Sequence, residues 1–269
     1  MPNPNDRTVV PGIVQPVITR NTPKLGPLAL MVATRIDLDD IIHLMGPDQV
    51  TPMRLYMSQL VVAGDHVAIA GPMMGAPYAT MILETLIAWG AREILFLGWC
   101  GAISSDIGIG DILIPSGAWI DEGTSAHYRL QEAPSDNQWP HHPDYMPVQP
   151  TTLTQGMKQI LETAAIPFHE GSIWTTDAIY RETPEKIACF QKKNAIGVEM
   201  ELSALLSVSR FHNVNLAAML VVSDSVSGST WKPGFRDQRF QSSRRLATNI
   251  MGQICQNPQM HISVSGLTG

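Results

Sequence analysis

The chain has 269 residues, of which 44% are hydrophobic and 16% are charged. This composition excludes a disordered protein, because disordered chains carry more charge and less apolar sequence. A formal net charge of −6 also excludes the basic surface of a typical nucleic-acid-binding protein, and so low a charge density predicts apolar surface that a homo-oligomer covers.

In chain order, residues 1–27 contain six prolines and predict an extended arm. We expect residues 28–256 to form one domain and residues 257–269 a tail. Short apolar runs alternate with helical patterns in that domain, which predicts a three-layer α/β/α sandwich around a mixed, largely parallel sheet. The predicted strands are 28–32, 66–70, 93–97, 194–198 and 215–222, with a hairpin at 111–115 and 118–120. The predicted helices are 37–44, 78–89, 151–163, 201–211 and 236–255.

No apolar run of about 18 residues occurs, so we expect no membrane-spanning helix. Three scattered cysteines and the lack of a leader-like N-terminus are typical of a cytoplasmic protein. The adjacent His141 and His142 lie in a proline-rich loop, 133–150, without a third ligand at metal spacing, so no metal site is predicted.

Polar or glycine-rich residues follow four of the predicted strands. Ligands of open α/β sheets bind at the carboxyl ends of strands, so these positions are candidates for a site. The four segments are Gly71–Pro77, Gly98–Ala102, Gly197–Glu201 and Val222–Ser225.

Together these segments resemble the nucleoside phosphorylase family, which includes purine nucleoside phosphorylases, uridine phosphorylases and methylthioadenosine nucleosidases. The Gly-Val-Glu-Met-Glu stretch at 197–201 with the later Val-Ser-Asp at 222–224 is the specific part, and Trp174–Tyr180 is similar to the base-side segment of the family. The resemblance implies a nucleoside phosphorylase fold from about residue 28 to 250, in a dimer or a trimer of dimers. An acid at position 224 implies a purine substrate.

Cleavage of an N-glycosidic bond builds positive charge on the ribose and negative charge on the leaving base. Glu201 is therefore the candidate carboxylate for the ribose hydroxyls, and Asp224 is the candidate proton donor to purine N7. Arg236 or Arg239 is a candidate partner for Asp224. The remaining candidate substrate contacts are Met74, Cys100, Gly101, Thr176, Ile179, Glu199, Met200 and Ser223.

The expected phosphate pocket departs from the family pattern. Phe96 and Trp99 stand where the family places an arginine and a hydroxyl residue, and neither offers the charged donor that a phosphate dianion needs. Arg35 and Arg54 are the remaining cations, and Arg54 matches an arginine that the family lends across a subunit interface. The predicted phosphate or water site comprises Arg35, Asp37, Arg54, Gly98 and Trp99.

Two interpretations stay open at this pocket. In the first, the protein transfers ribose to inorganic phosphate as co-substrate, with no cofactor. In the second, water replaces phosphate, and Asp37 or Asp39 serves as its base. A nucleoside-binding protein with a disabled anion site is a third, non-enzymatic reading.

Overall fold

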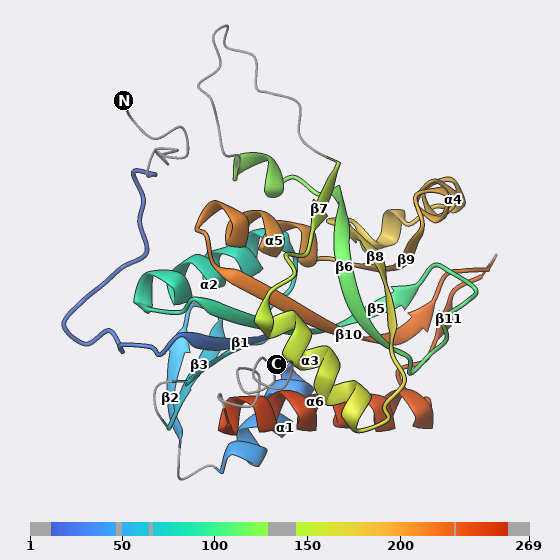
Figure 1. The fold of residues 1–269 in the computed structure, drawn as a ribbon. Coiled ribbons are helices and arrows are strands. Elements are labelled where there is room, and N and C mark those ends of the chain that lie inside the picture. The colour runs from blue at the N-terminus through green and yellow to red at the C-terminus, as the bar shows by residue number, and fades with distance from the viewer. Residues whose placement is uncertain (1–11, 47–49, 65–66, 129–143, 229, 258–269) are drawn as a thin grey trace, which may run out of the picture.

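A computed structural model describes residues 12–46, 50–64, 67–128, 144–228 and 230–257. A mixed β-sheet runs through the middle of the molecule and carries helices on both faces (Figure 1). The α/β architecture predicted from the alternation of strands and helices is therefore confirmed.

The described strands form one sheet. They are β1 (Leu28–Val32), β2 (Val50–Leu55), β3 (Ser58–Ala63), β4 (Val67–Gly71), β5 (Glu93–Ala102), β6 (Ile112–Asp121), β7 (Tyr145–Pro147), β8 (His169–Thr176), β9 (Ala195–Glu199), β10 (Asn215–Ser225) and β11 (Lys232–Pro233). Their order is β11-β10-β6-β8-β9-β5-β1-β4-β3-β2, with β7 beside β6. An additional pairing of β5 with β10 closes β10, β6, β8, β9 and β5 into a ring, so β5 stands at the centre of the sheet.

The helices divide between the two faces. They are α1 (Arg35–Met45), α2 (Ala76–Trp89), α3 (Thr152–Thr163), α4 (Pro184–Lys192), α5 (Leu202–Phe211) and α6 (Gln238–Gln256), with short 3-10 helices η2 (Ser125–His127) and η3 (Ile179–Arg181). Figure 1 shows α2 and α5 on one side of β10, and α1, α3 and α6 on the other. Each group covers its own apolar core.

Strand β10 shows why the sheet is buried on both faces. Its alternate residues enter the two cores, Leu216, Ala218, Leu220 and Val222 on the α2–α5 side and Ala217, Met219 and Val221 on the α1–α6 side. A strand covered by helices on both faces needs a continuous apolar sequence, and residues 215–222 have one.

The predicted hairpin at 111–120 is wrong. These residues form the single strand β6, which pairs with β8 along its length. Pro115-Ser116-Gly117 has the composition of a turn, but here the register shifts between Pro115 and Gly117, so the extra residue is absorbed as a bulge. The sequence interpretation also missed the β2–β3 hairpin, β8 and α4.

The ends of the chain and the proline-rich loop are described only in part. Residues 12–27 form no helix or strand, and the Trp89 indole donates a hydrogen bond to the Val17 carbonyl at 3.0 Å. His141 and His142 lie outside the described residues, as do residues 1–11 and 258–269. Within the described ranges, no helix has the length and apolarity needed to cross a membrane.

Candidate active site

The carboxyl ends of β5, β9 and β10 meet at Gly101. This residue pairs with Val198 of β9 on one side and with Asp224 of β10 on the other. Two strand spacings separate Val198 from Asp224, which corresponds to about 10 Å between their Cα atoms. β9 runs antiparallel to β5, and Glu199 and Glu201 lie one and three residues after Val198, so both glutamates follow the position where β9 pairs with the end of β5.

Glu199 anchors the start of α5. It is 5% exposed, and one of its oxygens accepts hydrogen bonds from the backbone N–H groups of Glu201 and Leu202, both at 2.7 Å. Its other oxygen accepts from the Thr175 hydroxyl. Every hydrogen bond of Glu199 therefore serves the protein itself, and the side chain fixes the backbone that carries Glu201.

Glu201 is also buried, at 7% exposed, and it accepts a hydrogen bond from the backbone N–H of Gly75, just before α2. This contact joins the turn after β4 to the end of β9. Met74, in that turn, is 78% exposed, and Met200 is half-buried. The two predicted methionine contacts, Met74 and Met200, are thus the chain neighbours of the hydrogen-bonded residues Gly75 and Glu201.

Burial raises the pKa of both glutamates, to about 8 for Glu199 and about 7 for Glu201, and Glu201 adds like-charge repulsion at Glu199. The hydrogen bonds from backbone N–H groups and from Thr175 oppose the rise. The two carboxyls titrate as a pair, so near neutral pH they share protons between them.

Asp224 is half-buried and held by two hydrogen bonds. The Ser223 hydroxyl donates to Oδ1 at 2.6 Å, and the Trp231 indole donates to Oδ2 at 2.7 Å. Ser223 is an extra residue in β10, because Val222 pairs with Cys100 while Asp224 pairs with the next residue, Gly101.

The predicted arginine partner of Asp224 is not seen among the described residues. Arg239 pairs with Asp111 instead, and no ion pair of Arg236 is present in the described part of the chain. In place of an arginine, the Trp231 indole donates to Asp224 Oδ2 from seven residues further along the chain.

Glu182 adds a carboxyl to the base end of the site. It follows η3, after the base-side strand β8, and is half-buried. Burial, together with the negative charge of Asp224, raises the pKa of Glu182 to about 7. Glu182 therefore lies within electrostatic reach of Asp224 and is only partly ionised near neutral pH.

The other predicted base contacts lie around this centre. Cys100 is 3% exposed, and burial raises its thiol pKa well above the usual value, which excludes an activated nucleophile. Ile179 is 53% exposed, so its side chain is open for contact. Thr176 is buried and donates to Asp121 at 3.3 Å, which places it in a cluster with Trp174 and Lys186.

Asp37 occupies the opposite end of the predicted site and is 1% exposed. Its Oδ1 accepts from Arg244 at 2.6 Å and from Thr248 at 3.3 Å. Its Oδ2 accepts from the Trp99 indole and the Thr34 hydroxyl, both at 2.7 Å. Both oxygens are thus occupied by protein donors.

Arg244 completes this ionic cluster. It is 3% exposed, and its Nη1 also donates to Asp40 at 2.8 Å. Trp99 packs edge-on against Phe240, and Gly98 lies between the side chains of Phe96 and Leu220. The contacts leave Asp37 no free oxygen with which to activate water, so its interpretation as a catalytic base loses support.

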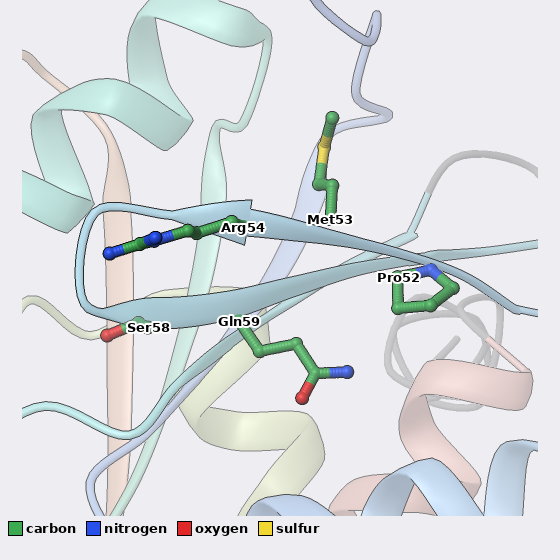
Figure 2. A pocket seen from close by; sticks show the side chains of 5 residues that line it. All are labelled: Pro52, Met53, Arg54, Ser58 and Gln59. Carbon is green, nitrogen blue, oxygen red and sulfur yellow. The ribbon is translucent and has the colours of Figure 1, made fainter.

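The two predicted phosphate cations lie on the surface. Arg35 pairs with Asp39, and both side chains are at least half exposed. Arg54 donates from Nε to the Tyr56 carbonyl at 2.9 Å near the tip of the β2–β3 hairpin. It lines an open hollow of about 340 Å³ with Pro52, Met53, Ser58 and Gln59 (Figure 2).

The hairpin is tied to the turn that carries Met74. Ser58 donates to the Pro72 carbonyl, and the Tyr78 hydroxyl contacts Ser58 at 2.7 Å. The Arg54 hollow is therefore joined through Ser58 to the substrate-side turn, and the segment before Arg35 is joined to the same turn by a hydrogen bond from the Met73 N–H to the Ala33 carbonyl at 3.0 Å.

Three residues with a place in the site were missed from the sequence: Trp231, Glu182 and Arg244. A helical signal was available for Arg244, because Phe240, Ala247, Thr248 and Met251 share its buried face of α6 at helical spacing. The sequence holds no comparable signal for Trp231 or Glu182, which reach Asp224 only through the fold.

The chain is similar in sequence to known phosphorylases. A sequence model of the family described as the phosphorylase superfamily matches residues 27–256. A DeoD-type purine nucleoside phosphorylase from Clostridium novyi is 27% identical over 189 residues, which are 70% of this chain and 76% of that protein.

Two solved structures share the fold. Purine nucleoside phosphorylase from Toxoplasma gondii, solved with immucillin-H, has a TM-score of 0.71 at 17% identity and covers 93% of this chain and 99% of its own. The methylthioadenosine/S-adenosylhomocysteine nucleosidase of Campylobacter jejuni has a TM-score of 0.69 at 18% identity, covering 85% and 98%. The same fold thus occurs both in a phosphorylase and in a nucleosidase.

Proposed function

The chain belongs to the phosphorylase superfamily, and from this premise we propose that it cleaves the N-glycosidic bond of a purine nucleoside by phosphorolysis. The C1′–N9 bond breaks, phosphate oxygen bonds to C1′, and the products are the free base and ribose 1-phosphate. The reaction needs inorganic phosphate as co-substrate and no cofactor. The observation that carries the proposal is the position of two acids near one residue of β5: Asp224 pairs with Gly101, and Gly101 pairs on its other side with Val198, three residues before Glu201.

Glu201 acts at the sugar in this proposal. Its ionised carboxylate accepts from the ribose hydroxyls and stabilises the positive charge that develops on the ring. Met74 and Met200 give the sugar an apolar, adaptable wall. Glu199 holds the backbone of Glu201 in place through its hydrogen bonds.

Asp224 acts at the base. A proton delivered to N7 neutralises the leaving purine as the glycosidic bond breaks. Ser223 orients the carboxyl, and Gly101 leaves room beside it, because a Cβ at position 101 would lie 3.4 Å from Asp224 Oδ2. Cys100 and Ile179 border the base.

Phosphate depends on Arg54. The Arg54 hollow is open, and the hairpin tip is apolar, with Met57 79% and Tyr56 41% exposed. Both features support a homo-oligomer in which the hairpin of one subunit completes the site of another. We place this activity in the cytoplasm, in line with the cysteine pattern.

Hydrolysis is the rival reaction, favoured by the missing charged donors at Phe96 and Trp99. The protein is incubated with inosine, adenosine and methylthioadenosine, with and without phosphate. Base released only with phosphate supports phosphorolysis, and base released equally without phosphate identifies a nucleosidase. Tight binding without release in either buffer identifies a binding protein and refutes the proposal.

A further inference from the structure

Trp231 lies on the acid that the proposed reaction uses at the base. Its indole Nε1 donates to Asp224 Oδ2 at 2.7 Å, although the side chain is 59% exposed. The only polar group of this exposed side chain is therefore hydrogen-bonded to a candidate catalytic carboxylate, which indicates a functional role for Trp231.

The position of the indole is built into the fold. β11 (Lys232–Pro233) folds back to pair with Asp224 and Ser225 of β10, and the Gly234 N–H donates to the Ser223 carbonyl at 2.9 Å. A Cβ at position 234 would come within 2.6 Å of that carbonyl oxygen, so only glycine allows the approach. The chain therefore returns over Asp224 at a fixed place.

Phe235 supports the indole from the other side. The ring centroids of Trp231 and Phe235 lie 6.2 Å apart, and Phe235 in turn lies 6.3 Å from Trp99. Since Trp99 is held by Asp37 and Phe240, the exposed Trp231 is connected through Phe235 to the partly buried Trp99 and the buried Phe240.

The oxygen that Trp231 uses is the one turned toward the site. Oδ2 is the Asp224 oxygen beside Gly101, whereas Ser223 holds Oδ1. An indole is a fused five- and six-membered ring with an N–H on the five-membered ring. A purine protonated at N7 presents the same N–H from the same kind of ring system.

We propose that Trp231 hydrogen-bonds the Asp224 oxygen that a purine protonated at N7 also uses, so that a purine binds by displacing the indole. This inference rests on the proposed function, because it takes Asp224 as the residue that faces the base. Trp231 then sets the affinity for the base and favours ligands that can hydrogen-bond Asp224 through N7. The exposed indole can leave without disrupting a packed core.

Trp231→Phe tests the displacement, because phenylalanine keeps an aromatic ring and loses the N–H. Calorimetry with hypoxanthine alone should show about threefold to tenfold tighter binding to the variant, the size expected when one competing hydrogen bond is lost. 7-Deazahypoxanthine, which cannot bond Asp224 through position 7, should bind both proteins equally. The matched control is Trp119→Phe, which removes an indole bond to Ser172 outside the site.

A spectroscopic readout accompanies the titration. Hypoxanthine should change the tryptophan emission of the wild-type protein, and the Trp231→Phe variant should lack that change. Equal or weaker hypoxanthine binding by the variant overturns the inference, as does failure of hypoxanthine to bind either protein.

The same experiments distinguish a failure of this inference from a failure of the proposed function. Tighter binding by the variant with no base released from any nucleoside retains the inference and refutes the enzyme activity. Base release by the wild-type protein with equal hypoxanthine affinities retains the activity and refutes the inference.

Discussion

The two ends of the site hold their carboxylates in opposite ways. At the base end, Asp224 is half-buried and, within the described part of the chain, accepts from two neutral donors, Ser223 and Trp231. At the other end, Asp37 is buried and bound to the guanidinium of Arg244. The first arrangement leaves a carboxyl group that a ligand can reach by displacing a neutral donor, and the second gives a carboxylate held in place by a cation.

This difference shows that an acidic residue at a strand end indicates a role only once its hydrogen-bond and ion-pair partners are known. An ion-paired carboxylate inside the protein stabilises the fold as long as both charges are present, because loss of one partner leaves the other uncompensated. We therefore expect variants at the base end to lose activity and variants at the Asp37 end to lose stability.

The largest expected effect is on chemistry at the base end. Asp224→Asn removes the proton donor and should lower purine release about 10²- to 10⁴-fold, with nucleoside affinity largely retained. Steady-state base release and equilibrium binding measure the two quantities. Asp106→Asn, an exposed acid after β5, is the control. A rate near that of the wild type would remove Asp224 from the mechanism.

The next effect is on stability at the other end. Arg244→Met leaves Asp37 buried without its cation and should lower the free energy of unfolding by about 3–5 kcal/mol. For a chain of this size that is a fall in Tm of roughly 10 °C, measured by thermal unfolding. Arg239→Met on the same helix, where the arginine side chain is 65% exposed, should cost less than about 1 kcal/mol. Equal Tm values for the two variants would contradict the contrast between the ends.

A smaller effect is expected from pH through Glu201. Its pKa of about 7 means that the ionised fraction rises about tenfold between pH 6 and pH 8, so KM for the nucleoside should fall over that range. Glu201→Gln should abolish the slope, and the exposed Glu162→Gln should retain it. A KM that is flat across this range in the wild type would argue against Glu201 at the ribose.

Glu199 and Glu201 together determine the direction in which the stability of the fold changes with pH. Their pKa values in the folded protein lie above that of an unfolded glutamate, so the folded state binds more protons between about pH 4.5 and pH 8. Their contribution to the free energy of unfolding should therefore decrease as pH rises through that window. Denaturant titrations of the wild type and Glu201→Gln at pH 5 and pH 8 measure this difference.

The smallest effect is expected at the exposed cations. Arg54→Ala should raise KM for phosphate severalfold and leave KM for the nucleoside unchanged, because one charged donor is lost. Arg35→Ala, already paired with Asp39, is the comparison and should have less effect. No change in phosphate KM on loss of Arg54 would exclude the hairpin from the phosphate site.

Most of the fold could be predicted because its signals are local. The apolar run at 215–222 and the helical pattern at 78–89, ending at Gly90 with φ 132°, depend on neighbouring residues alone. The prediction of a hairpin at residues 111–120 failed because Pro115 and Gly117 are typical of turns. Only the pairing of β6 with β8 reveals that these residues form a bulge in one strand. Closure of the sheet by β5 and β10 had no local signal at all.

The candidate site was likewise predictable where its signals are local and not where they depend on distant residues. Glu201 and Asp224 were found through motifs that each occupy a few consecutive residues. The partners that distinguish Asp224 from Asp37 come from elsewhere: Arg244 lies 207 residues from Asp37 along the chain. Helix-terminal acids have similar sequences whether they cap a helix, form an ion pair or face a ligand, and only the fold separates these cases.

The register shift at Ser223 has a consequence for how this protein tolerates change. Successive strand residues point to opposite sides and Val222 faces the α2–α5 core, so in a chain shortened by that single residue the acid would follow Val222 directly and face the α1–α6 side. The position of the proposed proton donor in β10 is thus set by a count of residues. An alanine in place of the serine preserves that count, whereas a deletion of one codon there would remove both the bulge and the Ser223 hydroxyl that Asp224 accepts from, and leave every other motif intact.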